Sequence, residues 1–178
     1  SDAFQNIIPT TNWMYPAVTP ANGLPDGFET LITPKSTLLL DAAMAGEMLG
    51  LKLLYMDAGS GARKPIPAAM IAAVSSHTAI PLIIGGGITT AEKAYENCKA
   101  GADIIFVESP ESEDEFKRIG DELSGCGAWL IANMVPTGRS PELPAKQLKA
   151  LGFSLAIWPG AVMAVAAAAT QNALKYLA

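Results

Sequence analysis

From residue 50 onward, short apolar runs alternate with segments that carry helix signals. The apolar runs cover residues 51–56, 80–84, 102–107, 128–132 and 153–158. The helix signals lie at residues 67–76, 91–100, 112–123, a segment ending near 151, and 161–177. Apolar runs of this length are typical of strands buried on both faces of a parallel sheet. The alternation predicts an α/β fold of βα units with right-handed crossovers, closed as a barrel or left open as a doubly wound sheet.

Capping signals mark where two of these helices begin. Thr89 and Glu92 are spaced as a capping box before the segment 91–100, and Ser112 and Glu115 are spaced in the same way before the next helix. In such a box the hydroxyl and the carboxylate each accept a backbone N–H that the first helical turn leaves unpaired. Both helices are therefore expected to start directly after a strand and a short turn.

The first 35 residues differ from the rest of the chain. Five prolines interrupt residues 1–35, which are expected to be irregular apart from one short strand around 12–18. Residues 36–49 are predicted to form a helix. The chain then offers about six βα units, whereas a closed TIM barrel has eight strands over ~250 residues. We predict one TIM-barrel-like domain over residues 1–178, incomplete or recombined.

Composition and charge indicate which classes of binding partner the chain is expected to have. The chain has a formal net charge of −5, which disfavours binding to nucleic acid. No apolar stretch reaches the roughly 18 to 20 residues that a membrane-spanning helix needs, and no export signal is recognised, so a cytoplasmic protein is expected. The two cysteines, Cys98 and Cys126, have neither metal-binding nor disulfide-scaffold spacing. A small-molecule ligand is the remaining class of partner.

Two apolar runs end in glycines, at YMDAGSGA and at IPLIIGGGITT. Bare backbone can approach an anion closely, and the N-terminus of the helix that follows adds positive potential. The candidate ligand-binding residues are Gly59, Ser60, Gly61, Gly85, Gly86 and Gly87. The alternative interpretation is that these glycines only permit tight turns.

Two different families resemble the two halves of the chain. Residues 36–103 resemble the C-terminal half of the prenylglyceryl phosphate synthases, the geranylgeranylglyceryl and heptaprenylglyceryl phosphate synthase family, through AMAGEMLGLKLLYMDAGSGA, PIPAAM and IPLIIGGGITTAEKAYENCKAGADII. Residues 104–178 resemble the isocitrate lyase and phosphoenolpyruvate mutase superfamily, through AGADIIFVESPES and IANMVPTGRSPELPAKQLKALGF. Both families are TIM barrels, and AGAD is common to both patterns. The chain therefore looks like a chimera of the two.

The resemblances imply roles for three further side chains. In the synthases, backbone N–H groups at three successive strand ends hold glycerol phosphate, and an acidic residue at the position of Asp57 acts on the substrate hydroxyl. Where the synthases carry Gly-Asn at the third strand end, this chain has Glu108-Ser109, which repels a phosphate. In the lyases, the residues matching Glu108 and Asn133 line the substrate site. Asp57 and Glu108 are the candidate catalytic residues, Asn133 joins the ligand-binding set, and Mg²⁺ is the one cofactor considered, with no protein ligands assigned.

Two functions remain open at this point. The preferred one is a recombined or designed βα-barrel scaffold without strong catalytic activity, because the acidic metal loops of both families are not found. The alternative is an enzyme that binds a small phosphorylated or carboxylated metabolite, as a synthase-like transferase or a lyase-like enzyme. The alanine-rich segment 161–169 has an apolar surface wide enough for burial on several sides, so homo-oligomers are expected.

Overall fold

The computed structural model describes residues 11–14, 37–59, 61–136 and 138–177. The strands are β1 (Thr11–Met14), β2 (Leu54–Asp57), β3 (Leu82–Gly85), β4 (Ile104–Phe106), β5 (Trp129–Asn133) and β6 (Leu155–Ile157). The helices are α1 (Thr37–Met48), α2 (Ala68–His77), α3 (Ala91–Lys99), α4 (Glu113–Leu123), α5 (Ala145–Ala150) and α6 (Ala161–Leu177).

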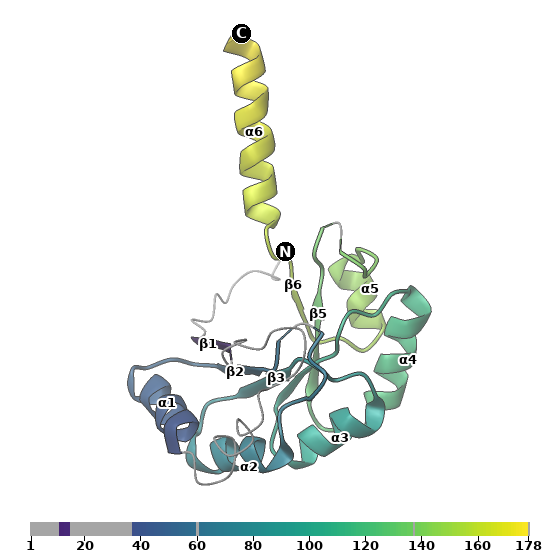
Figure 1. Cartoon of the computed structure of the whole chain (residues 1–178). Helices are drawn as coiled ribbons and strands as arrows, with labels where there is room; N and C mark the ends of the chain where they lie inside the picture. The colour runs from purple at the N-terminus through teal and green to yellow at the C-terminus, as the bar shows by residue number, and fades with distance from the viewer. Residues whose placement is uncertain (1–10, 15–36, 60, 137, 178) are drawn as a thin grey trace.

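The six strands form one parallel sheet in the order β1-β2-β3-β4-β5-β6, so each strand lies beside its neighbour in the sequence. Helices α1 to α5 provide the crossovers that parallel strands require. In the described part of the chain, β1 and β6 stay at opposite edges of the sheet and do not pair. The TIM-barrel-like α/β prediction with about six βα units is confirmed, and the barrel is open (Figure 1).

The sheet continues without a break through residue 103, where the two resemblances meet. Backbone bonds join the two sides directly, since Ile83 pairs with Ile104 and Ile84 with Ile105. The carboxylate of Asp103 also accepts the N–H of Leu82 at 2.9 Å. The division of one domain into an irregular segment 1–35 and parts 36–103 and 104–178 stays a prediction.

The outer face of the sheet carries the main hydrophobic core. Successive side chains of a strand point to opposite faces, so Leu54 and Met56 of β2 share the outer face. Helices α2 to α5 cover this face with fully or nearly fully buried side chains. These include Ile71, Val74, Ala94, Phe116, Leu123 and Leu148. Phe116 stacks edge to face on Phe153 at a centroid distance of 5.2 Å, which favours a single packing arrangement.

The inner face holds a smaller apolar cluster. Its buried members are Leu53, Ile83, Ile104 and Ile131, one from each of four successive strands or the residue before one. The aromatic rings beside them, Tyr55 and Phe106, are only partly buried. An open barrel leaves this face without the strands that would close over it, so its packing is thinner than that of the outer face.

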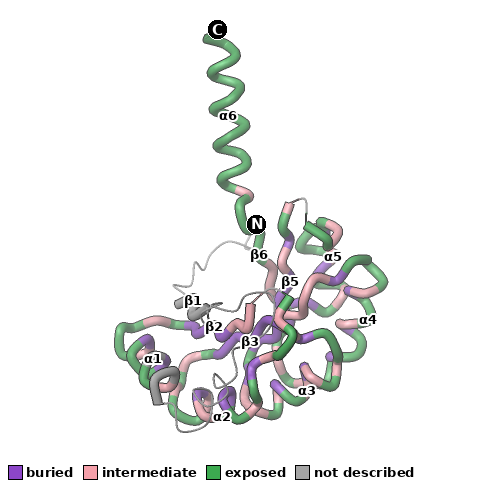
Figure 2. Tube along the Cα trace, in the orientation of Figure 1, coloured by how far each residue is buried: buried purple, intermediate pink, exposed green. Residues whose placement is uncertain are grey.

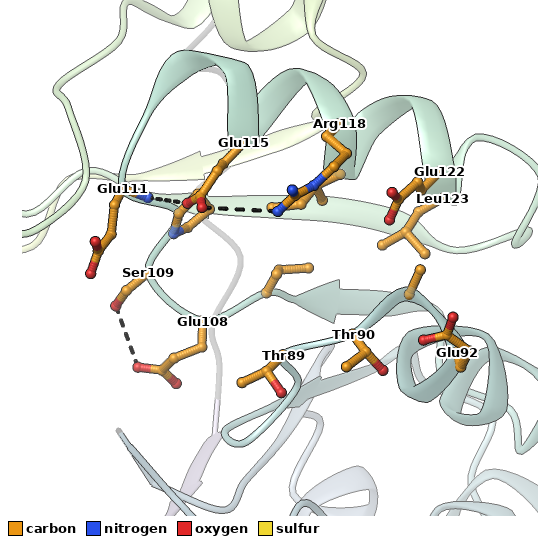
Figure 3. A pocket seen from close by; sticks show the side chains of 14 residues that line it. Thr89, Thr90, Glu92, Glu108, Ser109, Glu111, Glu115, Arg118, Glu122 and Leu123 are labelled. Atoms are coloured by element: carbon orange, nitrogen blue, oxygen red, sulfur yellow. Dashed lines mark hydrogen bonds and ion pairs between the residues drawn. The ribbon is translucent and has the colours of Figure 1, made fainter.

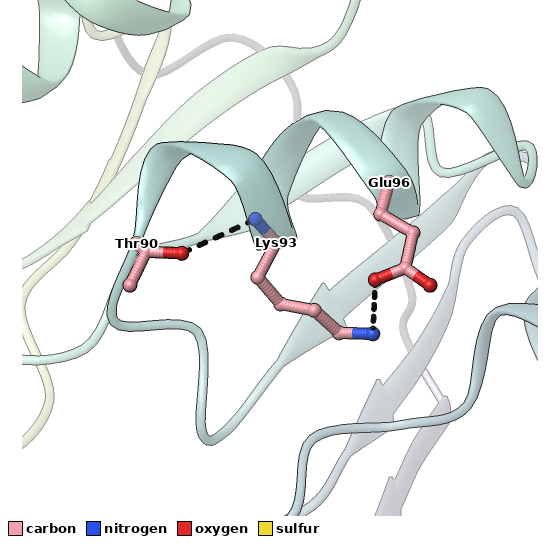
Figure 4. Close-up of polar contacts among 3 residues, drawn as sticks. All are labelled: Thr90, Lys93 and Glu96. Atoms are coloured by element: carbon pink, nitrogen blue, oxygen red, sulfur yellow. Dashed lines mark hydrogen bonds and ion pairs between the residues drawn. The ribbon is translucent and has the colours of Figure 1, made fainter.

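Hydroxyl caps begin two of the helices, as the sequence predicts, although one cap is shifted by a residue. Ser112 Oγ accepts the N–H of Glu115 at 3.2 Å. For α3 the cap is Thr90 instead of Thr89, because Thr90 Oγ1 accepts the N–H of Lys93 at 3.3 Å. The Lys93 side chain then pairs with Glu96 one turn later, at 2.8 Å (Figure 4).

Helix α6 extends away from the sheet and contacts little of it (Figure 1). It has no buried residue, and its large apolar side chains are largely exposed, including Val162 at 84% and Tyr176 at 91%. Figure 2 shows exposed positions along almost its whole length, while buried positions concentrate in the strands and the helices beside them. None of the described helices combines the length and the apolar character needed to cross a membrane.

Candidate functional site

The carboxyl ends of the strands meet at one edge of the sheet, and the predicted site residues lie there. Asp57, the last residue of β2, is in register with Gly85, the last residue of β3. Asn133 ends β5. Strand alternation places Asp57 on the inner face with Tyr55, and Asn133 on the same face with Ile131. The structure thus places Asp57 and Asn133 at one edge and on one face of the sheet.

Asp57 fixes the turn that follows β2. Its Oδ1 accepts the N–H of Gly59 at 2.9 Å, while the N–H of Ala58 donates to the carbonyl of Gly85 at 3.1 Å. A carboxylate that accepts a backbone N–H two residues later forms an Asx turn, which orients the loop. Asp57 thus has a structural role in this turn and remains half-buried beside the inner face.

Tyr55 is a member of this site that the sequence interpretation missed. Burial raises the pKa of the Tyr55 hydroxyl, and the charge of Asp57, a hydrogen bond to Asp57 and the charge of Glu108 raise it further. The phenol therefore stays protonated and donates at neutral pH. The signal was present in the sequence, because Tyr55 lies two residues before Asp57 and so shares its face.

The glycines of the second turn allow a close approach between the two strand ends. A Cβ at Gly86 would lie 2.6 Å from Asp57 Oδ1 and 2.7 Å from the nitrogens of Ala58 and Gly59, and its φ is +76°. A Cβ at Gly85 would lie 2.5 Å from the hydroxyl of Tyr55. A side chain at Gly86 would meet backbone, and one at Gly85 would displace the Tyr55 ring, so the two turns pack directly on each other.

The remaining glycines of the predicted set behave differently. Gly87 also packs closely, since a Cβ there would lie 2.9 Å from the carbonyl oxygen of Ala62. Gly59 and Gly61 have φ values of +95° and +69° but open space around the missing Cβ, so their backbone conformation alone favours glycine. Ser60 lies outside the described residues. Ligand binding by any of these residues stays a prediction.

Glu108 follows β4 and faces the same space as Tyr55, because its charge acts on the Tyr55 hydroxyl. Its N–H donates to the carbonyl of Ile88 at 3.3 Å, and Ser109 Oγ donates to its Oε1 at 3.5 Å. Ser109 has a φ of +36°, which is uncommon for a residue with a side chain. The structure thus brings two carboxylates, Asp57 and Glu108, to one phenol, and this makes the inner edge electronegative.

A cavity of about 470 Å³ adjoins Glu108 and opens between α3 and α4. Its labelled lining in Figure 3 contains the threonines before α3 and several carboxylates of α3 and α4. One cation, Arg118, lies among them, 3.9 Å from Glu115 Oε1. The acidic lining disfavours an anionic ligand here, so the cavity extends the electronegative character of the edge.

Asn133 is separate from the first two strand ends. Its Oδ1 is buried and has no hydrogen-bond partner among the described residues. Phe106 is in register with Ile131, and two further residues along each strand bring Glu108 level with Asn133. Asn133 lies three strands away from Asp57, or about 14 Å along the sheet. The structure therefore separates Asn133 from Asp57 and the glycines of β2 and β3, and Glu108 lies between them.

Within the described ranges, no group of three or more His, Cys, Asp or Glu side chains is arranged to hold a metal ion. Glu108 and Asn133 supply the carboxylate and amide oxygens that Mg²⁺ accepts as ligands, but they are only two. A Mg²⁺ ion at this edge would need oxygen atoms from water or from a substrate to complete its shell.

Comparison with known proteins gives a family match and curated relatives. The sequence pattern of the PcrB family matches residues 29–123. A geranylgeranylglyceryl phosphate synthase of Chitinophaga pinensis is 63% identical over 73 residues, covering 41% of this chain and 29% of that protein. The enzyme of the same name from Pyrococcus abyssi is 45% identical over 93 residues, covering 50% of this chain and 37% of that protein. The chain thus spans about a third of the length of these relatives.

Solved structures add a likeness of fold. A 2,3-dimethylmalate lyase, described as a member of the phosphoenolpyruvate mutase/isocitrate lyase superfamily, superposes with a TM-score of 0.64 at 21% identity. The superposition covers 78% of this chain and 55% of that chain. Both resemblances expected from the sequence are therefore found, the first in sequence and the second in fold.

The expectation of a recombined or designed scaffold without strong catalytic activity is wrong. The PcrB family pattern matches residues 29–123, and the relatives that are 63% and 45% identical over 73 and 93 residues are named geranylgeranylglyceryl phosphate synthase. An engineered origin and a chimera are likewise not supported. The mixed resemblance has a physical reason, because βα units of unrelated barrels share apolar strands and glycine turns.

Proposed function

Because the chain belongs to the PcrB family, we propose that it binds a glycerol phosphate at the carboxyl ends of β2 and β3 and serves a prenylglyceryl phosphate synthase-like transferase reaction. The contact between the two glycine turns carries this proposal. Gly86 lies so close to the Asp57 turn that a Cβ there would meet the nitrogens of Ala58 and Gly59, so bare backbone of two adjacent strand ends forms one surface. The chain spans about a third of its curated relatives, so the complete reaction is part of the proposal.

Helix α3 supports anion binding at the second turn. It begins after the glycine turn, with Thr90 as its cap, and its N-terminus carries the partial positive charge of the helix dipole. The phosphate of the substrate would accept N–H groups from the Gly85–Gly87 turn and from the Gly59–Gly61 turn. No side chain at Gly86 stands in the way.

We assign Asp57 as the general base for a hydroxyl of the bound glycerol phosphate. Its Oδ1 is held by the N–H of Gly59, so the carboxylate is already oriented toward the turn. Tyr55, protonated at neutral pH, would donate to the same carboxylate or to a substrate oxygen. Proton removal from the hydroxyl would make it the nucleophile toward the prenyl carbon.

Glu108 gives the sharpest test of phosphate binding. A Glu108→Gln variant removes a negative charge near the bound phosphate and keeps the size of the side chain. We expect it to bind glycerol 1-phosphate about threefold to tenfold more tightly by isothermal titration calorimetry. Glu122→Gln changes a carboxylate of α4 that lines the cavity between α3 and α4. It is the matched control and should leave the affinity for glycerol 1-phosphate unchanged.

The two variants separate the outcomes. If neither the parent chain nor Glu108→Gln binds glycerol phosphate at millimolar concentration, the proposed site is refuted. If both variants tighten binding equally, the effect reflects net charge alone, and Glu108 does not face the phosphate.

Asp57→Asn tests the catalytic assignment. The amide oxygen can still accept the N–H of Gly59, so the turn should persist and glycerol phosphate binding should be kept. Loss of the base should lower the rate of prenyl transfer from geranylgeranyl diphosphate by at least about 100-fold. The exposed Asp121→Asn variant, which only breaks the pair with Lys117, controls for charge. An unchanged transfer rate in Asp57→Asn would refute the role of general base.

A second candidate function is favoured by the unpartnered Oδ1 of Asn133 level with Glu108. A small hydroxylated dicarboxylate with Mg²⁺ could use both groups, as an isocitrate lyase-like enzyme would. Thermal shift with malate plus Mg²⁺ tests this separately from glycerol phosphate. Stabilisation that disappears in Asn133→Leu but not in Asp57→Asn would support the second candidate.

We also propose that the chain forms homo-oligomers through α6. The helix has 17 residues, is almost entirely exposed, and has Lys175 as its one charged residue. Such an apolar surface is costly in water, and a second copy would cover it. Sedimentation equilibrium should show self-association that Val165→Asp weakens. A strict monomer at high micromolar concentration would contradict this.

A further inference from the structure

The two cysteines of the chain, 28 residues apart in sequence, lie side by side at the amino-terminal edge of the sheet, opposite the glycine turns. Cys98 is in the last turn of α3, and Cys126 is in the turn between α4 and β5. Neither is in a disulfide, and each is partly exposed. Both pack against the same core cluster of the outer face.

Contacts between the two neighbouring helices set this juxtaposition. The hydroxyl of Tyr95 on α3 donates to the carbonyl of Glu122 on α4 at 3.1 Å. Cys98 lies one turn after Tyr95, and Cys126 lies four residues after Glu122, so the register that joins the first pair also aligns the second. The thiol of Cys126 donates to the carbonyl of Ala128 at 3.7 Å.

The sulfur atoms are close enough to interact. The pKa of the Cys98 thiol is raised to about 12, first by burial and then by a side-chain hydrogen bond with Cys126 and the charge of Cys126, which together outweigh the opposite effect of the Ala128 backbone. Cys98 is thus a protonated thiol at neutral pH, so it reacts slowly with peroxide and the pair oxidises only on prolonged exposure. Cys126 stands between Gly125 and Gly127, and the φ of Gly127 is +84°, so the turn has freedom to adjust.

We propose that Cys98 and Cys126 are a redox-sensitive dithiol pair that peroxides convert to an intramolecular disulfide linking α3 to the turn before β5. One thiol is oxidised by hydrogen peroxide to a sulfenic acid, and one water leaves. The sulfur of the second thiol then displaces the hydroxyl, so an S–S bond forms and a second water leaves. Two electrons pass from the sulfurs to the peroxide, and no other reductant or oxidant is needed.

The disulfide would act on stability and leave the candidate site untouched. It closes a loop between the end of α3 and the start of β5, and this loop contains all of β4 and α4. The cross-link restricts the unfolded chain, so the oxidised protein should melt about 5–10 °C higher than the reduced protein. The strand carboxyl ends lie at the other edge of the sheet and should bind ligands equally in both forms.

The test treats the folded chain with hydrogen peroxide and measures intact mass under non-reducing, denaturing conditions. We expect a loss of about 2 Da, reversed by dithiothreitol, and a cross-linked peptide containing both cysteines. Cys98→Ser and Cys126→Ser should gain oxygen instead of losing hydrogen. Two intact thiols after prolonged treatment, or disulfide-linked dimers in place of the internal bond, would overturn the proposal.

A relocated cysteine separates spatial proximity from chain flexibility. The variant Cys126→Ser with Ser124→Cys keeps nearly the same loop length, but the Ser124 hydroxyl is hydrogen-bonded back to Asp121 at 2.9 Å and faces α4. Internal disulfide formation should be at least about tenfold slower than in the parent chain. Circular dichroism confirms that each variant is folded before oxidation. Equal rates would show that the native juxtaposition plays no part, and would also overturn the proposal.

Discussion

The two faces of the sheet differ in how much apolar surface they bury and in the polar side chains they carry. The outer face is covered by helices and holds the larger apolar cluster, with Asn97 as the one buried polar residue among those described. The inner face has a thinner cluster and carries Tyr55, Asp57 and Asn133 at its carboxyl edge. Both faces hold a buried amide without a full set of hydrogen-bond partners, Asn97 on the outer side and Asn133 on the inner side, so the faces differ in apolar packing and in the polar side chains at the carboxyl edge. The contrast predicts that substitutions on the outer face cost more stability than matched substitutions on the inner face, where the candidate site residues lie.

Deleting an aromatic ring from each face should give the largest difference. Phe116→Ala removes a ring that is 1% exposed and stacked on Phe153, and it should lower the free energy of unfolding by about 3–5 kcal/mol. Phe106→Ala removes a partly buried ring beside Tyr55 and should cost about 1–2 kcal/mol. Urea denaturation measures both. Equal losses would mean that the inner face is covered in solution, and the contrast between the faces would fail.

Adding one methyl group to each face should give a smaller difference. At Gly120, a Cβ would overlap the carbonyl oxygen of Leu151, and that backbone cannot turn aside, so Gly120→Ala should cost about 2–3 kcal/mol. At Gly85 the clash is with the Tyr55 side chain, which can move, so Gly85→Ala should cost about 1 kcal/mol.

Gly125→Ala is the control for this pair of substitutions. The nearest atom to a Cβ there is the Tyr95 hydroxyl oxygen at 3.5 Å, an ordinary contact. Its stability should change by less than about 0.5 kcal/mol. If Gly85→Ala proves as costly as Gly120→Ala, the ring of Tyr55 is held more rigidly than an open inner face allows.

Tyr55→Phe should have the smallest effect at neutral pH and a distinct effect in alkali. It removes the hydrogen bond to Asp57, at a cost of about 1 kcal/mol. The folded protein holds the phenol proton more tightly than the unfolded chain does, so this contribution is complete below the unfolded pKa of about 10. It is lost as pH rises from there toward the higher folded pKa.

The alkaline branch of the stability curve checks this assignment. Tyr55→Phe should lose less stability than the parent between pH 10 and higher pH, each measured relative to its own value at pH 8. Tyr176→Phe, at a position 91% exposed, should follow the parent. Parallel curves for Tyr55→Phe and the parent would place the phenol in solvent and remove it from the site.

Most of the secondary structure was predicted correctly from local sequence patterns. Helix α6 has the predicted bounds, and every predicted strand is present, since apolar runs and caps are short-range signals. The Thr90 cap was missed in favour of Thr89 because two adjacent threonines offer equivalent hydroxyls. The strands proved shorter than the apolar runs, because sheet pairing ends where the backbone turns and apolar side chains continue beyond it.

The sequence predicted the candidate site residues only where a polar residue or a glycine ends an apolar run. Asp57 and the glycines stand directly after apolar runs, and the structure places them at one edge. Tyr55 was missed because an aromatic residue within an apolar run suggests core packing first. The proximity of Cys98 and Cys126 depends on how α3 and α4 align, and the spacing of residues along the chain does not predict that alignment.

The strand order of the sheet equals the order of the strands along the chain. Each βα unit therefore contacts mainly the units before and after it, as in a linear array of repeats. In such an array, a perturbation at one end weakens with each interface that it crosses. Paired residues of adjacent strands are nevertheless 21 to 43 positions apart in the chain, and such non-local pairing slows the folding of a parallel sheet. A truncation from the C-terminus is therefore expected to disturb the two glycine turns last, because β2 and β3 lie three or more strands away from β6.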